Sequence, residues 1–224
     1  MNIAEEPIFQ FLSQYAYQPN MIYLIFVGMM LLSAVGFPLP EEITLISVGL
    51  LAFIGNNPQL FPPPYEGAPA VNVKTAAVFA FFIVLLSDFI IYALGRLWGK
   101  KILKFPLFKK FLNEERWDKI EKWTHRYGAY ACGIFRFTPG LRFPGHLATG
   151  MMKFPVWKFL LIDGVAAAIS VPTQIYLIGI HGESILLKMK EFKIILFSTL
   201  LALVVIYFLR KFFNKKFNQS VKQP

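Results

Sequence analysis

Apolar residues occur in long runs along this chain, and we expect three of the runs to be transmembrane helices. They cover residues 75–97, 156–180 and 194–209. A helix needs about 20 apolar residues to cross the hydrocarbon core of a bilayer, which the first two runs supply, and the shorter 194–209 is expected to be the last transmembrane helix. The pattern predicts an all-α polytopic membrane protein with a single membrane domain over residues 1–224.

The run at 156–180 contains residues that usually weaken a helix. Asp163-Gly164 and Val171-Pro172 lie inside it, and His181-Gly182-Glu183 follows it. We expect the two internal pairs to interrupt the helix and the His181 segment to begin a turn. Asp163 is also predicted to be a buried acid.

Residues 21–55 contain two shorter apolar limbs on either side of a break. The limbs, 21–35 and 43–54, each fall short of a full span, and the break contains Pro38 and Pro40. This arrangement predicts a re-entrant helical hairpin with an adjacent pair of acids, Glu41 and Glu42, at its tip. The alternative is that the first limb spans the membrane in the ordinary way and leaves the glutamates at an interface.

Residues 127–153 combine two arginines with two Pro-Gly pairs in an otherwise apolar region. Arg136 and Arg142 flank Pro139-Gly140, and Pro144-Gly145 follows. Proline lacks a backbone donor and disfavours helix at the preceding residue, so both pairs are expected to break the helix. Broken backbone and permanent charge are tolerated at membrane depth only when buried in protein or facing a wet cavity. We therefore predict a second re-entrant hairpin here and the main functional site.

One face of the predicted helix 75–97 carries an acid, a phenol and two small residues. Asp88, Tyr92, Gly95 and Gly99 recur at spacings of four, three and four, which places them on the same side of a helix. We expect this face to point into the protein, with the glycines allowing close approach of a neighbouring helix. The alternative is a packing face with one hydrogen-bonded carboxylate.

The charge distribution sets the orientation. The chain is 56% hydrophobic with 16% charged residues and a formal net charge of +10, and the basic residues cluster beside apolar runs. Residues 98–126 carry nine Lys or Arg against four acids, and the tail 210–224 is also basic. Clusters of this kind face the cytoplasm and favour anionic lipid headgroups over nucleic acid as a partner. Mixed apolar and basic residues in 98–126 further predict an amphipathic surface segment.

The orientation supports the second hairpin. If 98–126 and 210–224 are both cytoplasmic, an even number of crossings separates them. Residues 156–180 and 194–209 supply two crossings, so 127–153 must return to the side from which it enters. The two hairpins then open to opposite sides, each followed by a long helix, as in inverted-repeat transporters.

Other chemistry is weakly represented. The three histidines, His125, His146 and His181, show no metal-ligand spacing, and no nucleophile is paired with a base by a recognised spacing. The single cysteine, Cys132, cannot form an internal disulfide. We expect no enzyme activity, no metal and no cofactor.

Three sequence blocks resemble the DedA family of bacterial inner-membrane proteins, which shares its fold with the VTT group of scramblases. The blocks read FPLPEEITLISVGLLA, DFIIYALGRLWGK and FRFTPGLRFPGHLATGMMKFPVWKF, and the third is the most specific. The resemblance implies two opposed re-entrant hairpins and movement of lipids between leaflets. It implies essential roles at the positions of Glu42, Arg136 and Arg142. Where the family often has an acid upstream this chain has Met30, and Glu41 replaces a glycine.

From these residues we expect a flippase or scramblase of the bacterial inner membrane for a phosphate-containing lipid. The resemblance implies a membrane phospholipid such as phosphatidylethanolamine, or a polyprenyl phosphate such as undecaprenyl phosphate, with coupling to the proton motive force in some members. The expected transport residues are Arg136, Arg142, Glu41, Glu42, Asp88, Tyr92 and Asp163. The alternative is a proton-coupled exporter of small cations. Whether the protein forms a homo-oligomer is left open.

The orientation can be tested by thiol labelling from each side of the membrane. Single cysteines placed in 98–126 and in 210–224, with Cys132 replaced, should react only from the cytoplasmic side, because both segments are strongly basic. Labelling of either segment from outside would remove the topological argument for a re-entrant 127–153.

Overall fold

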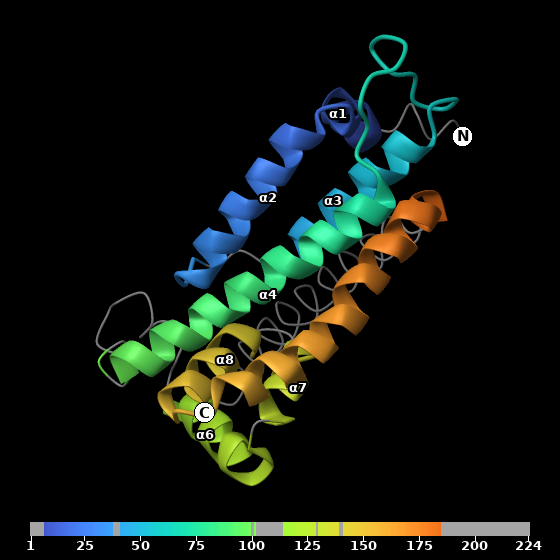
Figure 1. Ribbon diagram of the computed structural model, residues 1–224. Helices are drawn as coiled ribbons and strands as arrows, with labels where there is room; N and C mark the ends of the chain where they lie inside the picture. The colour runs from blue at the N-terminus through green and yellow to red at the C-terminus, as the bar shows by residue number, and fades with distance from the viewer. Residues whose placement is uncertain are drawn as a thin grey trace, which may run out of the picture. The chain divides into compact units, whose positions relative to one another are not determined.

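The computed structural model describes residues 7–37, 41–99, 101, 114–128, 130–138 and 141–184. The chain divides into two units, Met1–Ile180 and His181–Pro224. The described residues form helices and their connections, with no strand among them (Figure 1). The predicted span 194–209 and the tail 210–224 lie outside the described residues.

Eight helices follow one another along the described part of the chain. In order they are α1 (Pro7–Ala16), α2 (Pro19–Ala34), α3 (Glu41–Asn56), α4 (Val73–Trp98), α6 (Glu114–Tyr127), α7 (Tyr130–Arg136), α8 (Arg142–Met151) and the helix Val156–Ser184.

Two of these helices are long and apolar enough to cross a membrane. They are α4, with 26 residues, and Val156–Ser184, with 29. At 1.5 Å per residue they extend for about 39 and 44 Å, more than the hydrocarbon thickness of about 30 Å. A third candidate arises if Phe9–Ala16 and Pro19–Ala34, which are bent by 108°, count as one span. The predicted spans 75–97 and 156–180 are thus confirmed as helices of sufficient length.

The outward faces of both long helices are apolar. On α4 the exposed side chains include Val78, Phe82 and Leu86, spaced four residues apart. The helix Val156–Ser184 has a matching stripe made of Leu161, Val165 and Ile169. Such contiguous apolar surface is unfavourable in water, so it indicates contact with lipid tails.

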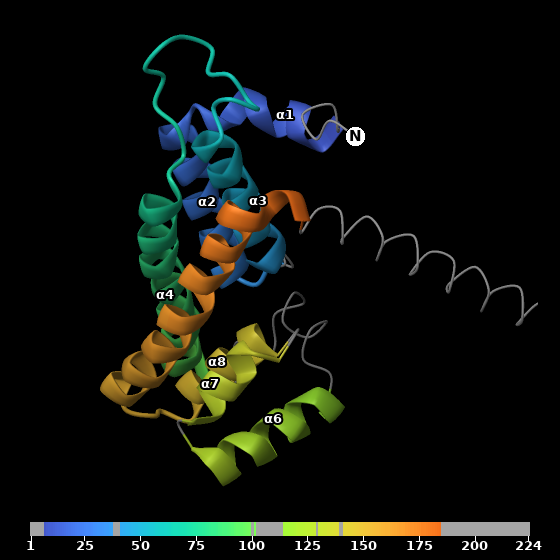
Figure 2. The same ribbon diagram turned by 90° about the vertical axis from the view of Figure 1, so that its right-hand side faces the viewer.

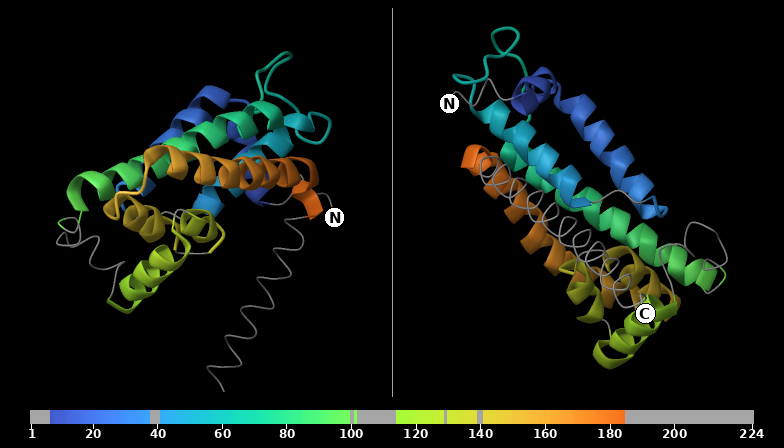
Figure 3. Two further views of the ribbon diagram at one scale, coloured as in Figure 1. Left: turned by 60° about the horizontal axis from the view of Figure 1, so that its bottom comes forward. Right: turned by 180° about the vertical axis from the view of Figure 1, so that it is seen from behind.

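The helix α4 is the element against which α2, α3, α8 and Val156–Ser184 pack. Tyr23 and Phe26 of α2 contact Phe79, and the Ser87 hydroxyl donates to the Met30 carbonyl at 3.1 Å, so α2 runs parallel to α4. The helix Val156–Ser184 runs antiparallel, with Phe159 stacked on Tyr92 at 4.5 Å between ring centroids. Figure 2 shows α2 and α3 beside the N-terminal half of α4, and α7 and α8 beside its C-terminal half. Seen from behind in Figure 3, α3 lies between α2 and Val156–Ser184.

The first predicted break is present between two 16-residue helices. At the end of α2, Gly36 has φ +93°, and its N–H and that of Phe37 donate to Ser33 and Leu32. This is a Schellman ending, which glycine permits because it lacks a Cβ. The structure therefore confirms two short limbs around a break, while Pro38 and Pro40 lie outside the described residues.

The second break differs from its prediction in one respect. The helix α7 ends at Arg136 and α8 begins at Arg142, so the chain breaks around Pro139-Gly140, which itself lies outside the described residues. Pro144 and Gly145, in contrast, lie in the first turn of α8 and do not interrupt it. The first-turn N–H groups have no helical partner, so proline loses nothing at this position.

The helix Val156–Ser184 is continuous, and the predicted interruptions at Asp163-Gly164 and Val171-Pro172 are wrong. A proline removes one backbone hydrogen bond, but at membrane depth no water compensates for giving up the others, so the helix persists. It also passes His181 and Gly182 instead of turning there.

Glycines let α4 and α8 approach until their backbones touch. A Cβ added to Gly95 would overlap the carbonyl oxygen of Leu147, and one added to Gly150 would overlap that of Tyr92. This confirms the expected close approach at Gly95. A Cβ added to Gly99 would meet no atom of the described residues within 4 Å. Gly99 instead ends α4, with φ +52°.

Substitution of the crossing glycines should lower thermal stability. Gly150→Ala and Gly95→Ala force backbone against a new methyl group, and overpacking of this kind costs about 1–3 kcal/mol. The apparent Tm in detergent should fall by several degrees. Gly164→Ala is the matched control, because its Cβ would meet only a side-chain carbon at 4.0 Å. A Gly150→Ala protein with the apparent Tm of the wild type would contradict the close approach of α4 and α8.

Candidate functional site

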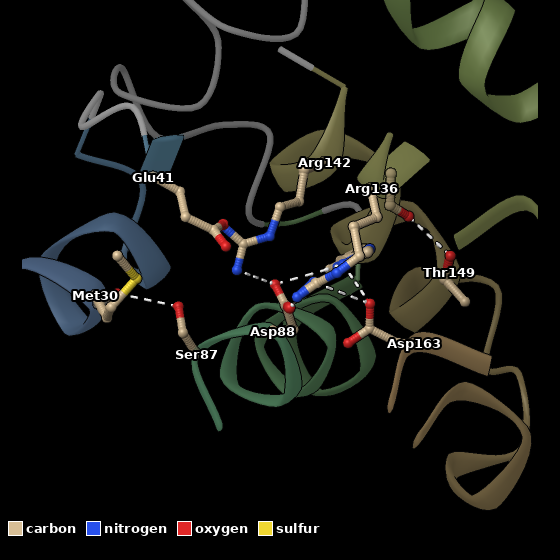
Figure 4. Close-up of polar contacts among 10 residues, drawn as sticks. Met30, Glu41, Ser87, Asp88, Arg136, Arg142, Thr149 and Asp163 are labelled. Carbon is tan, nitrogen blue, oxygen red and sulfur yellow. Dashed lines mark hydrogen bonds and ion pairs between the residues drawn. The ribbon is translucent and has the colours of Figure 1, made fainter. Parts of the chain in front are cut away.

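Arg136, the last residue of α7, forms ion pairs with two buried acids. Its Nη1 lies 2.6 Å from Asp88 Oδ2 and 3.3 Å from Asp163 Oδ1 (Figure 4). The acids come from the middle of α4 and from Val156–Ser184, so three elements meet at this guanidinium group. All three side chains are almost fully buried. The structure thus brings together three of the expected transport residues.

Arg142, the first residue of α8, joins the two breaks of the chain. Its guanidinium group pairs with Glu41, the first residue of α3, and its Nη2 lies 2.6 Å from Asp88 Oδ1. Asp88 therefore faces both arginines, one with each carboxylate oxygen. The first-break acid in contact is Glu41, whereas the Glu42 side chain is exposed.

His146 also belongs to this cluster, although its sequence context gave no metal or catalytic motif. Its Nε2 lies 3.4 Å from Asp88 Oδ1 and 3.2 Å from Asp163 Oδ1, and the side chain is fully buried. The signal that could have identified it is its spacing of four residues from Arg142, which shares a helix face. That signal was hidden because Pro144-Gly145 was expected to break the helix between them.

Tyr92 lies apart from the ion-pair cluster. Its hydroxyl donates to the Phe154 carbonyl, and Arg96 Nη1 donates to the same carbonyl at 2.8 Å and to the Tyr92 oxygen at 2.7 Å. These bonds hold the end of α8 against α4. The transport role expected for Tyr92 remains a prediction, and its contacts describe a packing role.

The cluster contains donors that its own acids leave unused. Among the described residues, Nε of both arginines and Nη2 of Arg136 are buried without a hydrogen-bond partner. A buried donor without a partner costs about 1–3 kcal/mol, so these nitrogens are available to an acceptor such as a ligand oxygen or an ordered water.

The ligand-type atoms of Asp88, His146 and Asp163 lie within 4.8 Å of one another, which is close enough to hold a metal ion. The same two acids are already paired with guanidinium groups, and a divalent cation there would be repelled by both arginines. We therefore treat the cluster as an ion-pair network. The expected absence of a metal remains a prediction.

Comparison with known proteins places the chain in a family. The family model of the VTT domain matches residues 18–179. A protein of Haemophilus influenzae titled "Uncharacterized membrane protein" is 33% identical over 75% of this chain and 71% of its own length. An "Inner membrane protein" of Borreliella burgdorferi is 26% identical over 94% of this chain and 93% of its own. No solved structure matches. The site residues described above all lie within the matched segment. The chain belongs to the VTT-domain, or DedA, family of membrane proteins.

Proposed function

We propose that this protein is a transporter, a flippase or scramblase, that moves a phosphate-containing lipid between leaflets of the bacterial inner membrane. The observation that carries the proposal is a pair of buried arginines with unused donors at the meeting point of two broken helices. Undecaprenyl phosphate and phosphatidylethanolamine are the candidate substrates. The proposed role involves no enzymatic step.

The chemistry of the arginines supports this function. A guanidinium group stays charged at every relevant pH and offers a planar pair of donors that fits two phosphate oxygens. Carboxylates occupy the guanidinium groups where phosphate oxygens would bind, with Glu41 on Arg142 and Asp163 on Arg136. An arriving phosphate competes with these carboxylates, so the site can alternate between internal and substrate partners.

The arrangement of the breaks supports a path for the headgroup. The α2–α3 and α7–α8 pairs are proposed to enter the membrane from opposite sides as re-entrant hairpins, in an inverted repeat with several membrane crossings. Their tips meet through Glu41 and Arg142. Irregular backbone is stable at that depth when it faces protein or a polar cavity, which is also what a lipid headgroup requires. The basic segment 98–126, of which α6 is the described helix, is proposed to lie against anionic headgroups at the cytoplasmic face.

A second candidate is a proton-coupled exporter of small cations. It is favoured by the excess of acids, because Glu41, Asp88 and Asp163 outnumber the two arginines. A cation would then bind the carboxylates directly, and the arginines would only hold the hairpins together. Lipid movement and cation efflux can be assayed separately in the same proteoliposomes.

Replacement of arginine by lysine separates phosphate recognition from charge balance. Arg136→Lys and Arg142→Lys keep the charge but lose the paired donors, so lipid translocation in proteoliposomes should fall at least about tenfold. Arg126→Lys, an exposed site on α6, is the control and should retain wild-type rates. Each protein should first be shown to elute as a folded species.

Two outcomes would count against the phosphate site. Full translocation by both lysine variants would show that charge alone is sufficient. Recovery of translocation in charge-neutral pairs such as Arg142→Gln with Glu41→Gln would assign the arginines to a structural ion pair.

The two adjacent glutamates provide a further test. Glu41→Gln removes one of the two carboxylates on Arg142 and leaves only Asp88. The charged contact between the two breaks is then lost, so translocation should fall by about tenfold or more. Glu42→Gln is a matched control at an exposed neighbour and should change the rate by less than about twofold. Rates are compared at equal amounts of reconstituted protein. A larger loss in Glu42→Gln than in Glu41→Gln would favour Glu42, the position that the family resemblance indicates, over the Glu41–Arg142 contact.

A further inference from the structure

We propose that His146 is a proton-binding residue of the transport site, which takes up one proton when a lipid phosphate occupies Arg136 and Arg142. This inference rests on the proposed function and assigns a role to a residue that the sequence motifs leave out. It makes the proton a co-substrate of the anion.

The position of His146 fixes which of its nitrogens can accept a proton. Its Nε2 lies 3.4 and 3.2 Å from carboxylate oxygens of Asp88 and Asp163. A lone pair on Nε2 would face two negative oxygens, so Nε2 carries hydrogen and the neutral ring has its lone pair on Nδ1. Neither ring nitrogen makes a regular hydrogen bond among the described residues, but carboxylate oxygens lie within 3.4 Å of Nε2 alone. A proton from the aqueous side therefore adds to Nδ1 and gives an imidazolium.

The groups around the ring set its charge environment. From α4 and Val156–Ser184 come the Asp88 and Asp163 carboxylates, and from α7 and α8 the Arg136 and Arg142 guanidinium groups. The Glu41 carboxylate of α3 pairs with Arg142. Cys132 of α7 belongs to the same hydrophobic cluster as Phe159, and the Phe159 ring meets the imidazole edge to face at 5.4 Å between centroids. With a neutral His146, two positive and three negative charges leave the cluster with one net negative charge.

An arriving phosphate shifts this balance in one direction. It adds at least one negative charge and draws the guanidinium donors away from Asp88 and Asp163. The carboxylates then lose their positive neighbours, and both lie within 3.4 Å of His146. A nearby negative charge favours the protonated form of an imidazole, so uptake of a proton offsets the charge that the phosphate brings. Binding of proton and anion is therefore mutually favourable.

Proton uptake can be counted by calorimetry on the purified full chain. The probe is dihexanoylphosphatidylglycerol, a soluble phosphodiester that does not itself titrate between pH 6 and 8. Titration at one pH in buffers of different ionisation enthalpy gives the number of protons bound per ligand. The wild type should take up about one proton per bound ligand. Its affinity should then weaken by up to tenfold for each unit that the pH rises, because His146 is neutral in the free protein and must gain a proton on binding.

His146→Gln should bind the probe with close to zero proton uptake and an affinity that no longer depends on pH. Gln cannot titrate but still donates to the two carboxylates, so a purely structural role would be preserved. His146→Asn serves the same purpose if His146→Gln does not fold. His181→Gln, at an exposed histidine, is the control and should behave as the wild type.

The outcomes distinguish this inference from the function on which it rests. Binding by the wild type without proton uptake, or unchanged uptake in both His146 variants, would overturn the role of His146 and leave the phosphate site intact. Absence of binding by the wild type, or unaltered binding by Arg136→Lys and Arg142→Lys, would overturn the phosphate site and this inference with it.

Discussion

The Asp88 carboxylate is the contact on which the rest of the site depends. One of its oxygens lies 2.6 Å from Arg136 and the other 2.6 Å from Arg142, and the side chain is completely buried. Removing one partner from a buried ion pair costs about 3–5 kcal/mol, because the remaining charge is left without compensation. At membrane depth that cost cannot be relieved by water. A single acid on α4 therefore ties both sides of the second break to the central helix.

A side chain as short as aspartate can do this only because the helices are unusually close. Gly95 and Gly150 bring the backbones of α4 and α8 into contact, and the bonds from Tyr92 and Arg96 to the Phe154 carbonyl hold the end of α8 in place. The close packing is set at the C-terminal end of α4, about one to two turns from Asp88. The crossing thus fixes where α8, and with it Arg142, lies relative to Asp88.

The sequence predicted the helices and most of the charged residues of the site, because both depend on local features. Run length identified α4, helical spacing placed Asp88 and Gly95 on its buried face, and prolines located the two breaks, Pro38 and Pro40 the first and Pro139 the second. The choice between Glu41 and Glu42 could not be made in this way. Neighbouring residues point about 100° apart on a helix, so the choice depends on where α3 begins after a proline-rich break.

The contacts that could not be predicted from the sequence depend on where a proline falls in its helix or on residues far apart in the chain. His146 joins the cluster only if Pro144 occupies the first turn of α8, and a proline read in isolation indicates a break. Asp163 pairs with Arg136 across 27 residues, and no local pattern encodes that partnership. Its helix also continues through Pro172, since the membrane environment penalises broken hydrogen bonds more strongly than the residue preference does.

Under the proposed function, the balance of charges would suit transport better than a permanent structure. A phosphate that entered a site of two free arginines would bind tightly and leave slowly, whereas here it would exchange with carboxylates that already occupy the guanidinium groups. Such an exchange would replace one set of ion pairs by another, so neither state would be deeply trapped. The displaced acids would remain beside His146, whose distance of 3.2 Å from Asp163 gives them a neighbour able to become positive. With His146 protonated, three positive side chains would balance the three acids, so the single negative charge of a bound phosphodiester would leave the net charge of the site as it is without the ligand.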